Sequence, residues 1–329
     1  MMGLHGKRVK VLAMLLFAMG LPLLGVSLGA PTRVPMSGRP MTAEALMPAD
    51  VLSRVWLLRD EVDLLRREMG CPENLKAEMD VSGAAPREVY FQALILRQRA
   101  NRLAIEFTGI PDVELDVSFA AEIRPLQVWE VVDSALQKIL IIKEHLGIEE
   151  TVQERSAPVE TEPSDVFVSI VQVNRQVDLL LENTFAPRDV YREVSRSIAY
   201  AARLLSQYPK VERIPEPPPL ERFKRPDDVY HRLRDCFNDV RLLAEAQELD
   251  MLRIEGDFLV GEEMSPSDVY DLATLLVSEL AYLHAQIPGA ERPVSTYDPG
   301  RKFPSHVYQR VGILQKQLKL LLERAESVE

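Results

Sequence analysis

Seven aromatic residues recur at one position of a repeated phrase, and their type and spacing suit ligand or partner binding. Each follows a valine that lies three residues after a proline. Tyrosine and tryptophan combine a large apolar surface with a polar tip, so a row of such rings can line a groove for a peptide, a glycan or another apolar ligand. The same rings can instead form a packing layer between helices. The candidates for ligand or partner binding are Tyr90, Trp129, Phe167, Tyr191, Tyr230, Tyr270 and Tyr308.

Residue types that support catalysis or metal binding do not form a recognisable set in this sequence. Asp228 and His231 lie three residues apart and would share a helix face, but a metal site in a helical bundle needs several such pairs. The chain has no His-Glu-x-x-His, no glycine-rich phosphate loop, no Cys-x-x-Cys and no Gly-x-Ser-x-Gly. We therefore expect no catalytic residues, no metal and no cofactor, and we predict that the protein is not an enzyme.

The repeated phrase itself predicts helix starts. Proline is tolerated at the first position of a helix, where its missing N–H would have no partner in any case. In six of the eight copies an acidic residue follows two positions later, where its carboxylate can accept a free backbone N–H. Helices are expected to begin at Pro48, Pro86, Pro125, Pro163, Pro187, Pro226, Pro266 and Pro304.

Apolar residues follow each start at alternating intervals of three and four, which is typical of helices packed side by side. The first copy continues with Val51, Val55, Leu58, Val62 and Leu65. A run of about three heptads corresponds to roughly 33 Å of helix at ~1.5 Å per residue. The sequence therefore predicts an all-α fold: a helical repeat array or bundle of about eight helices with long packed linkers.

The intervals between the prolines are 38, 39, 38, 24, 39, 40 and 38 residues, which is symmetric about the centre. This divides the chain into repeats one to four, residues 47–186, and repeats five to eight, residues 187–329. The short central interval predicts an antiparallel hairpin of helices four and five.

The other linkers, of about 15 residues, are long enough to return along a helix at ~3.3 Å per residue, so that successive helices would be parallel. Antiparallel neighbours joined by loose loops are the alternative. We expect the linkers to lie packed along the helices, because long structureless loops are uncommon in compact domains. Residues 110–117 alternate as a docked extended segment would, and the proline-rich residues 209–226 are expected to be stiff.

The N-terminus has the three regions of a secretory signal peptide. Basic residues at 7–10 precede an apolar run at 11–28, and small residues follow. Cleavage would remove residues 1–29 and leave residues 30–46 as a flexible tether. An uncleaved anchor is the alternative, but Pro22 interrupts the run, whose length of about 18 residues is at the lower limit for a membrane span.

Cleavage would change the net charge from −11 to −14, since the segment holds three basic residues and no acidic one. Such an acidic chain is a poor candidate for binding nucleic acid or anionic lipid. We expect a periplasmic or secreted protein with no stable membrane insertion after cleavage.

Two cysteines raise the question of a disulfide in an oxidising compartment. Cys236 falls on the predicted seam of helix six, where other copies carry leucine or valine, and Cys71 follows the end of helix one. A small buried core residue is the simpler interpretation of Cys236.

Two classes of function fit these features. The first is a non-catalytic scaffold or adaptor that binds a protein partner in the cell envelope. The second is a soluble ligand-binding protein that uses the aromatic row as its pocket. We favour the scaffold, because the repeats place their apolar residues along continuous seams and leave long surfaces more readily than one deep cavity.

Overall fold

The computed structural model describes residues 46–73, 80–110, 123–182, 185–255, 264–294 and 300–326. The predicted signal peptide, the predicted tether up to residue 45 and residues 111–117 of the expected extended segment lie outside these ranges. The chain divides into Met1–Met41 and Thr42–Glu329, and the fold described here belongs to the second unit.

The described residues form eight α-helices, and every one begins at a proline of the repeated phrase. This confirms the all-α prediction. A two-stranded antiparallel sheet, in which Val81 lies opposite Ile254, is the one addition. The elements are α1 Pro48–Glu68, β1 Asp80–Ser82, α2 Pro86–Thr108, α3 Pro125–His145, α4 Pro163–Leu180, α5 Pro187–Leu205, α6 Pro226–Glu245, β2 Arg253–Glu255, α7 Pro266–Ala285 and α8 Pro304–Glu326.

The residue two positions after each proline closes the helix start. The carboxylate of Asp50 accepts the backbone N–H of Met47 at 2.8 Å. Where the acid is replaced, Gln127 accepts through its side-chain oxygen at 2.7 Å, and His306 accepts through Nδ1 at 3.0 Å. The same contact occurs at all eight starts, so the repeated phrase is a helix-capping device that satisfies a backbone donor.

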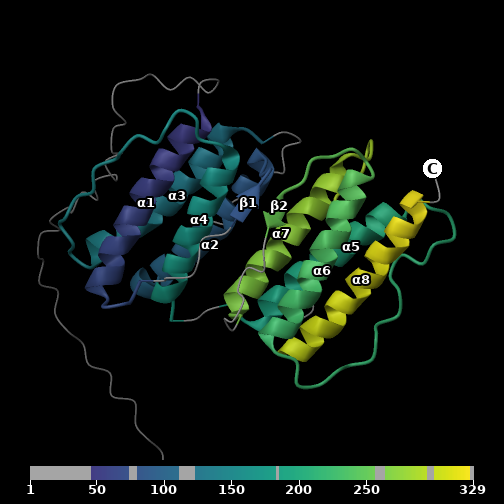
Figure 1. Ribbon diagram of the computed structural model, residues 1–329. Helices are drawn as coiled ribbons and strands as arrows, with labels where there is room; N and C mark the ends of the chain where they lie inside the picture. Colours follow the sequence, from purple (N-terminus) through teal and green to yellow (C-terminus); the bar gives the residue numbers. More distant parts are fainter. Residues whose placement is uncertain are drawn as a thin grey trace, which may run out of the picture. The chain divides into compact units, whose positions relative to one another are not determined.

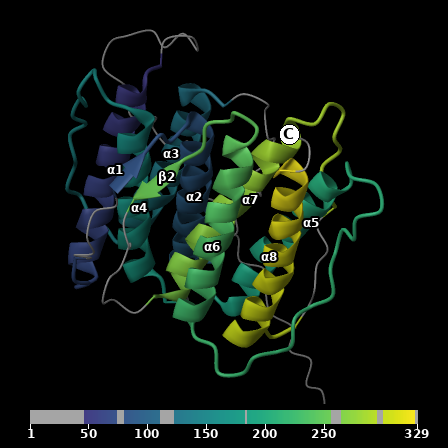
Figure 2. The same cartoon turned by 45° about the vertical axis from the view of Figure 1, so that its right-hand side comes forward.

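The helices form two four-helix bundles with the same order of contacts (Figures 1 and 2). In the first bundle α1 and α2 each pack against α3 and α4, and in the second bundle α5 and α6 each pack against α7 and α8. The bundles meet where α2 packs against α7. The seam residues are buried throughout; Val177 in α4 and Leu318 in α8, at equivalent positions of their repeats, are both 0% exposed.

Helices within a bundle run parallel. In the first bundle the four starting prolines, Pro48, Pro86, Pro125 and Pro163, surround one small recess of about 20 Å³. In the second bundle the starts of α6 and α8 are joined by a hydrogen bond from the Lys224 N–H to the Ser305 hydroxyl. Of the two arrangements that the linker lengths allow, parallel and antiparallel neighbours, the structure has the parallel one.

The linker before α6 returns along α8, as a parallel arrangement requires. Gln317 donates to the carbonyl of Arg213, and Gln309, nearer the start of α8, donates to the carbonyl of Pro218 at 2.8 Å. Gly312 permits this approach, because a Cβ there would lie 2.7 Å from the Pro218 ring. The expectation that the linkers pack along the helices is confirmed for this segment.

The predicted hairpin of helices four and five is wrong. Arg87 at the start of α2 pairs with Glu279 late in α7, and Arg99 pairs with Asp271 early in α7, so α2 and α7 are antiparallel. Since each bundle is parallel within itself, α4 and α5 do run in opposite directions. They belong to different bundles, however, because the apolar seam of each packs against helices of its own bundle.

Candidate functional site

The seven aromatic candidates do not form one groove. They lie near the starts of their helices, and the two bundles run in opposite directions, so the row is divided between the bundles. Phe167, Tyr230 and Tyr270 are buried, whereas Tyr90, Trp129, Tyr191 and Tyr308 are partly buried.

Most of these rings have packing roles. Tyr270 stacks on Phe185 with ring centroids 3.8 Å apart, and its hydroxyl donates to Gln98 at 3.1 Å. Burial, with a smaller effect of nearby Glu193, raises the pKa of Tyr270 to about 12, so the ring stays neutral. Trp129 lies 5.3 Å from the guanidinium of Arg54.

The remaining buried rings and Tyr90 are also in contact with neighbours. Phe167 and Tyr230 line a recess of only about 60 Å³. Tyr90 meets Phe91 edge to face with ring centroids 6.1 Å apart. The recess at Phe167 and Tyr230 would hold no ligand larger than a few waters.

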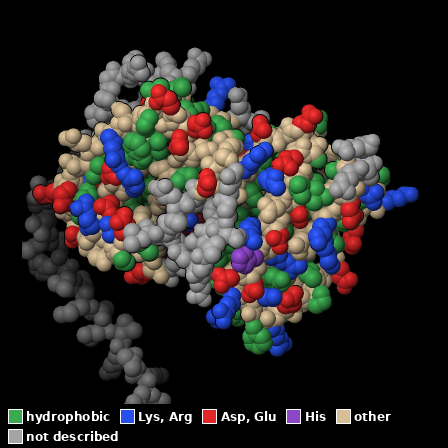
Figure 3. All heavy atoms as spheres, viewed as in Figure 1, with side chains coloured by type: hydrophobic (Ala, Val, Ile, Leu, Met, Phe, Trp, Pro, Cys, Tyr) green, Lys and Arg blue, Asp and Glu red, His purple; other side chains and the backbone are tan. Residues whose placement is uncertain are grey.

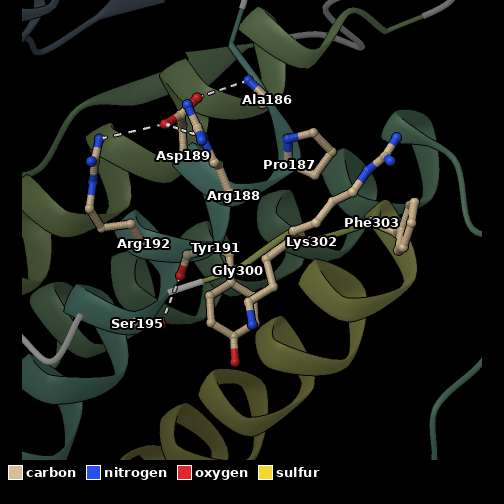
Figure 4. A pocket seen from close by; sticks show the side chains of 11 residues that line it. Ala186, Pro187, Arg188, Asp189, Tyr191, Arg192, Ser195, Gly300, Lys302 and Phe303 are labelled. Atoms are coloured by element: carbon tan, nitrogen blue, oxygen red, sulfur yellow. Dashed lines mark hydrogen bonds and ion pairs between the residues drawn. The ribbon is translucent and has the colours of Figure 1, made fainter. Parts of the chain in front are cut away.

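Tyr191 differs, because it lines a cavity of about 820 Å³ between the start of α5 and the segment before α8 (Figure 4). Such a volume lies within the range of about 300–1,000 Å³ that is usual for ligand sites. The ammonium of Lys302 lies 4.7 Å from the Tyr191 ring and the guanidinium of Arg310 lies 5.3 Å from it. Arg310 is fixed in turn by donating to the Ser195 hydroxyl at 3.2 Å.

The described lining of this cavity is strongly basic. It contains Arg188, Arg192, Arg301 and Lys302, against one carboxylate, that of Asp189. That carboxylate caps α5 by accepting the Ala186 N–H at 2.9 Å (Figure 4). The lining therefore offers an excess of positive charge in a chain whose net charge is −11.

At the start of α8, which Lys224 reaches through Ser305, the segment before α6 presents an aromatic ring to solvent. Phe223 is 94% exposed and has a φ of +63°, a conformation that is costly for a bulky residue. Its neighbour Lys224 holds the segment in place through Ser305, through Glu221 at 2.8 Å and over the Tyr308 ring at 4.2 Å. The segment is thus anchored while the phenylalanine projects outward.

We call this surface the basic–aromatic end of the second bundle. Phe303, 50% exposed, adds a second ring, and the Arg301 guanidinium lies 5.3 Å from it. Figure 3 shows Lys and Arg side chains bordering hydrophobic ones at the lower end of the right-hand bundle. The members are Arg188, Arg192, Arg222, Phe223, Arg225, Arg301, Lys302 and Phe303.

Of the seven aromatic candidates from the sequence, Tyr191 is the one in the described lining of the cavity. The sequence analysis missed the basic residues. Their signal is local: within four residues before a starting proline, the second half of the chain carries five basic residues and the first half carries Arg124 alone. The net charge of the whole chain conceals this difference. The five residues are Arg222, Lys224, Arg225, Arg301 and Lys302.

A second concentration of charge lies where the bundles meet. Arg99, 0% exposed, pairs with Asp178 and with Asp271, each at 2.8 Å. Burial raises the pKa of Asp271 to about 7, with Arg99 opposing the shift and Asp178 adding to it. Two carboxylates around one guanidinium therefore favour retention of a proton near neutral pH.

The same arrangement recurs at the start of α2. Arg87 lies 2.7 Å from Glu88 and 3.4 Å from Glu279, and both carboxyls are buried. Burial, followed by the proximity of Glu88, raises the pKa of Glu279 well above its usual value. These clusters join the bundles, and Arg87 also lines a cavity of about 470 Å³ between the start of α2 and the end of α7.

Cys71 and Cys236 are both free thiols. Cys236 is fully buried on the α6 seam, and burial raises the pKa of its thiol, which confirms its interpretation as a core residue. Among the described residues there is no group of three or more His, Cys, Asp or Glu side chains placed to hold a metal ion. In the same ranges, no helix combines the length and the apolar character that crossing a membrane requires.

No protein-family model, no curated protein and no solved structure matches this chain.

Proposed function

We propose that this protein is an exported, non-catalytic adaptor of the cell envelope that binds a protein partner through the basic–aromatic end of its second bundle. Export rests on the basic, apolar and small-residue pattern of residues 1–29. The parallel bundles would act as a rigid support that holds this end in place.

The observation that carries the proposal is the exposure of Phe223. An aromatic ring that is 94% exposed, at positive φ and on an anchored segment, gains nothing for folding. Aromatic and arginine side chains are the residue types that contribute most to protein–protein affinity. Phe223 lies between Arg222 and Lys224, so an exposed hydrophobic anchor and charges that can steer a partner occur together.

A soluble ligand-binding protein is the second candidate, and one observation favours it. Tyr191 borders a cavity of about 820 Å³, large enough for a small molecule. The pocket would then depend on one ring of the aromatic row, since the other six lie elsewhere.

Site-specific photo-crosslinking tests the adaptor. A photoreactive phenylalanine analogue is placed at position 223 and, as a matched control, at position 159, where Val159 is 80% exposed on the first bundle's linker. In envelope fractions we expect one discrete protein adduct from position 223 and none from position 159. The adduct should disappear when Arg222→Gln and Arg225→Gln are added, because the steering charges are then lost.

Equal adducts from both positions would indicate nonspecific contact and would count against the adaptor. A stoichiometric small molecule in the purified protein, without a protein adduct, would favour the second candidate.

A further inference from the structure

The cavity at the start of α5 differs from an ordinary helix-terminus anion site. Pro187 at the first helical position has no N–H to offer. The carboxylate of Asp189 already occupies the front of the helix, where it accepts the Ala186 N–H at 2.9 Å. A compact dianion such as phosphate would meet this carboxylate where helix ends usually attract phosphate.

The cations instead surround the helix end. Arg188, with its side chain 70% exposed, and Arg192 come from α5, whereas Arg301 and Lys302 come from the segment before α8. Within α5, Arg188 and Arg192 each lie 3.9 Å from Asp189, and Arg192 lies 3.3 Å from Glu193. The four cations therefore face two carboxylates and leave a positive excess that is spread over separate positions. This distribution suits several single negative charges spaced along a chain better than one concentrated charge.

The fixed aromatic surface supports the same conclusion. The Tyr191 ring is held between Lys302 at 4.7 Å and Arg310 at 5.3 Å, so the cavity has an apolar wall as well as cations. Phe303, beside the cavity, is half exposed. A flat lipid surface would not follow a recess of about 820 Å³, whereas an extended peptide with alternating acidic and apolar side chains can.

We infer that the cavity in Figure 4 binds an acidic peptide segment, whose carboxylates pair with Arg188, Arg301 and Lys302 and whose apolar side chains contact Tyr191 and Phe303. This inference rests on the proposed adaptor function and adds the chemistry of the partner.

The test measures binding of a fluorescent hexapeptide of alternating glutamate and phenylalanine to the full chain, by anisotropy at low and physiological salt. The lysine–phenylalanine counterpart controls for apolar adhesion. The triple variant Arg188→Gln, Arg301→Gln, Lys302→Gln should weaken binding of the acidic peptide by about tenfold or more, and binding to the wild type should weaken as salt rises.

The matched control is Arg124→Gln, which neutralises an exposed basic residue before a starting proline of the first bundle. It should change the affinity by less than about twofold, because Arg124 precedes α3 of the first bundle and is not part of the cavity lining. Circular dichroism of both variants checks that the helices are retained.

Two competitors separate other anions from the peptide. Inorganic phosphate at equal ionic strength should displace no more peptide than chloride does, and vesicles containing phosphatidylglycerol should not bind the chain through these residues. Displacement by phosphate, or vesicle binding that the triple variant abolishes, would overturn the inference.

Failure of the inference and failure of the adaptor are distinguishable. If the peptide binds the triple variant as well as the wild type, or binds neither, while position 223 still forms its discrete adduct, the cavity is wrongly assigned and the adaptor stands. If the peptide binds as expected but position 223 forms no adduct, the cavity binds acidic segments and the adaptor fails.

Discussion

The helix starts of the two bundles share one construction but present different surfaces. In the first bundle, four prolines and the four valines that follow them close around a recess of about 20 Å³ with no polar lining. In the second bundle the equivalent valines are equally buried, yet a basic cavity of about 820 Å³ opens between the starts of α5 and α8.

The difference arises from residues that precede the prolines. These positions lie outside the helical seam, so they can vary without disturbing the core. The first bundle places Gly83, Ala84 and Ala85 before α2, where they line a cavity of about 760 Å³ whose charged groups come from the second bundle. The second bundle places Arg301, Lys302 and Phe303 before α8, so its own residues make that cavity basic. The repeat thus separates what holds the fold together from what the bundle offers to other molecules.

The largest loss of stability should come from disrupting the buried apolar seam, which each bundle has at equivalent positions. Val177→Asp in the first bundle and Leu318→Asp in the second each bury an unpaired charge at a position that is 0% exposed. Each should lower the free energy of unfolding by about 3–5 kcal/mol, measured by chemical denaturation followed by circular dichroism. Leu179→Asp, at a residue 38% exposed, is the control and should cost about 1 kcal/mol or less.

A loss from Val177→Asp no larger than from Leu179→Asp would contradict the burial of the seam. Equal losses in both bundles would show that the seams are energetically alike and that the bundles differ only at their ends.

The contact between the bundles should be nearly as sensitive. Arg99→Met removes the buried cation shared by Asp178 and Asp271, whose side chains are 16% and 22% exposed, which should cost about 3 kcal/mol at pH 8. Adding Asp271→Leu should recover part of that loss, because one uncompensated carboxyl is removed. Arg97→Met, on the same helix but only partly buried, is the control. A loss from Arg99→Met that did not exceed the control would mean that the bundles are held together elsewhere.

The same contact predicts a pH dependence. The pKa of Asp271 in the folded state is about 7, above the usual 3.8, so the folded chain binds the extra proton. Stability from this group is present below its unfolded pKa and is lost as pH rises through about 7. The groups facing it are Arg99 on α2, Asp178 on α4 and Asp268 on α7.

Between pH 5 and pH 8 the wild type should lose roughly 2 kcal/mol of unfolding free energy that Asp271→Asn does not lose. Denaturation curves at several pH values give this difference directly, and taking the difference removes the contribution of other groups, such as His284, whose pKa burial lowers. Parallel pH profiles for the two proteins would show that Asp271 ionises normally.

Much of this architecture follows from the sequence. Proline at each start and an acceptor two residues later determine where every helix begins, because both act within one helical turn. Helix direction did not follow, because a linker of about 15 residues and a seam with a 3–4 period suit parallel and antiparallel bundles alike. The hairpin prediction failed for a related reason: the interval from Pro163 to Pro187 determines that the chain reverses, not which helices each segment contacts.

The candidate site was less predictable than the fold. Tyr191 was indicated by its place in the repeat, but six other aromatics share that place and mostly serve packing. What distinguishes Tyr191 is its neighbours Lys302 and Arg310, which come from a segment and a helix more than 100 residues away in the sequence. Only the parallel pairing of α5 with α8 brings them together.

The smallest effects should come from single helix starts, and here the two ends should respond differently. Asp189 caps α5 at the cavity and Asp165 caps α4 in the first bundle, each by accepting a backbone N–H at 2.8–2.9 Å. Asparagine keeps an acceptor oxygen at this position, so Asp189→Asn and Asp165→Asn should each change the unfolding free energy by about 0.5 kcal/mol or less. Asp189→Asn also removes the one carboxylate of the described cavity lining. The acidic hexapeptide should therefore bind that variant roughly threefold more tightly, whereas Asp165→Asn should leave its affinity unchanged. If both variants, or neither, bound the acidic hexapeptide more tightly, the helix starts of the two bundles would not differ in charge as the structure indicates.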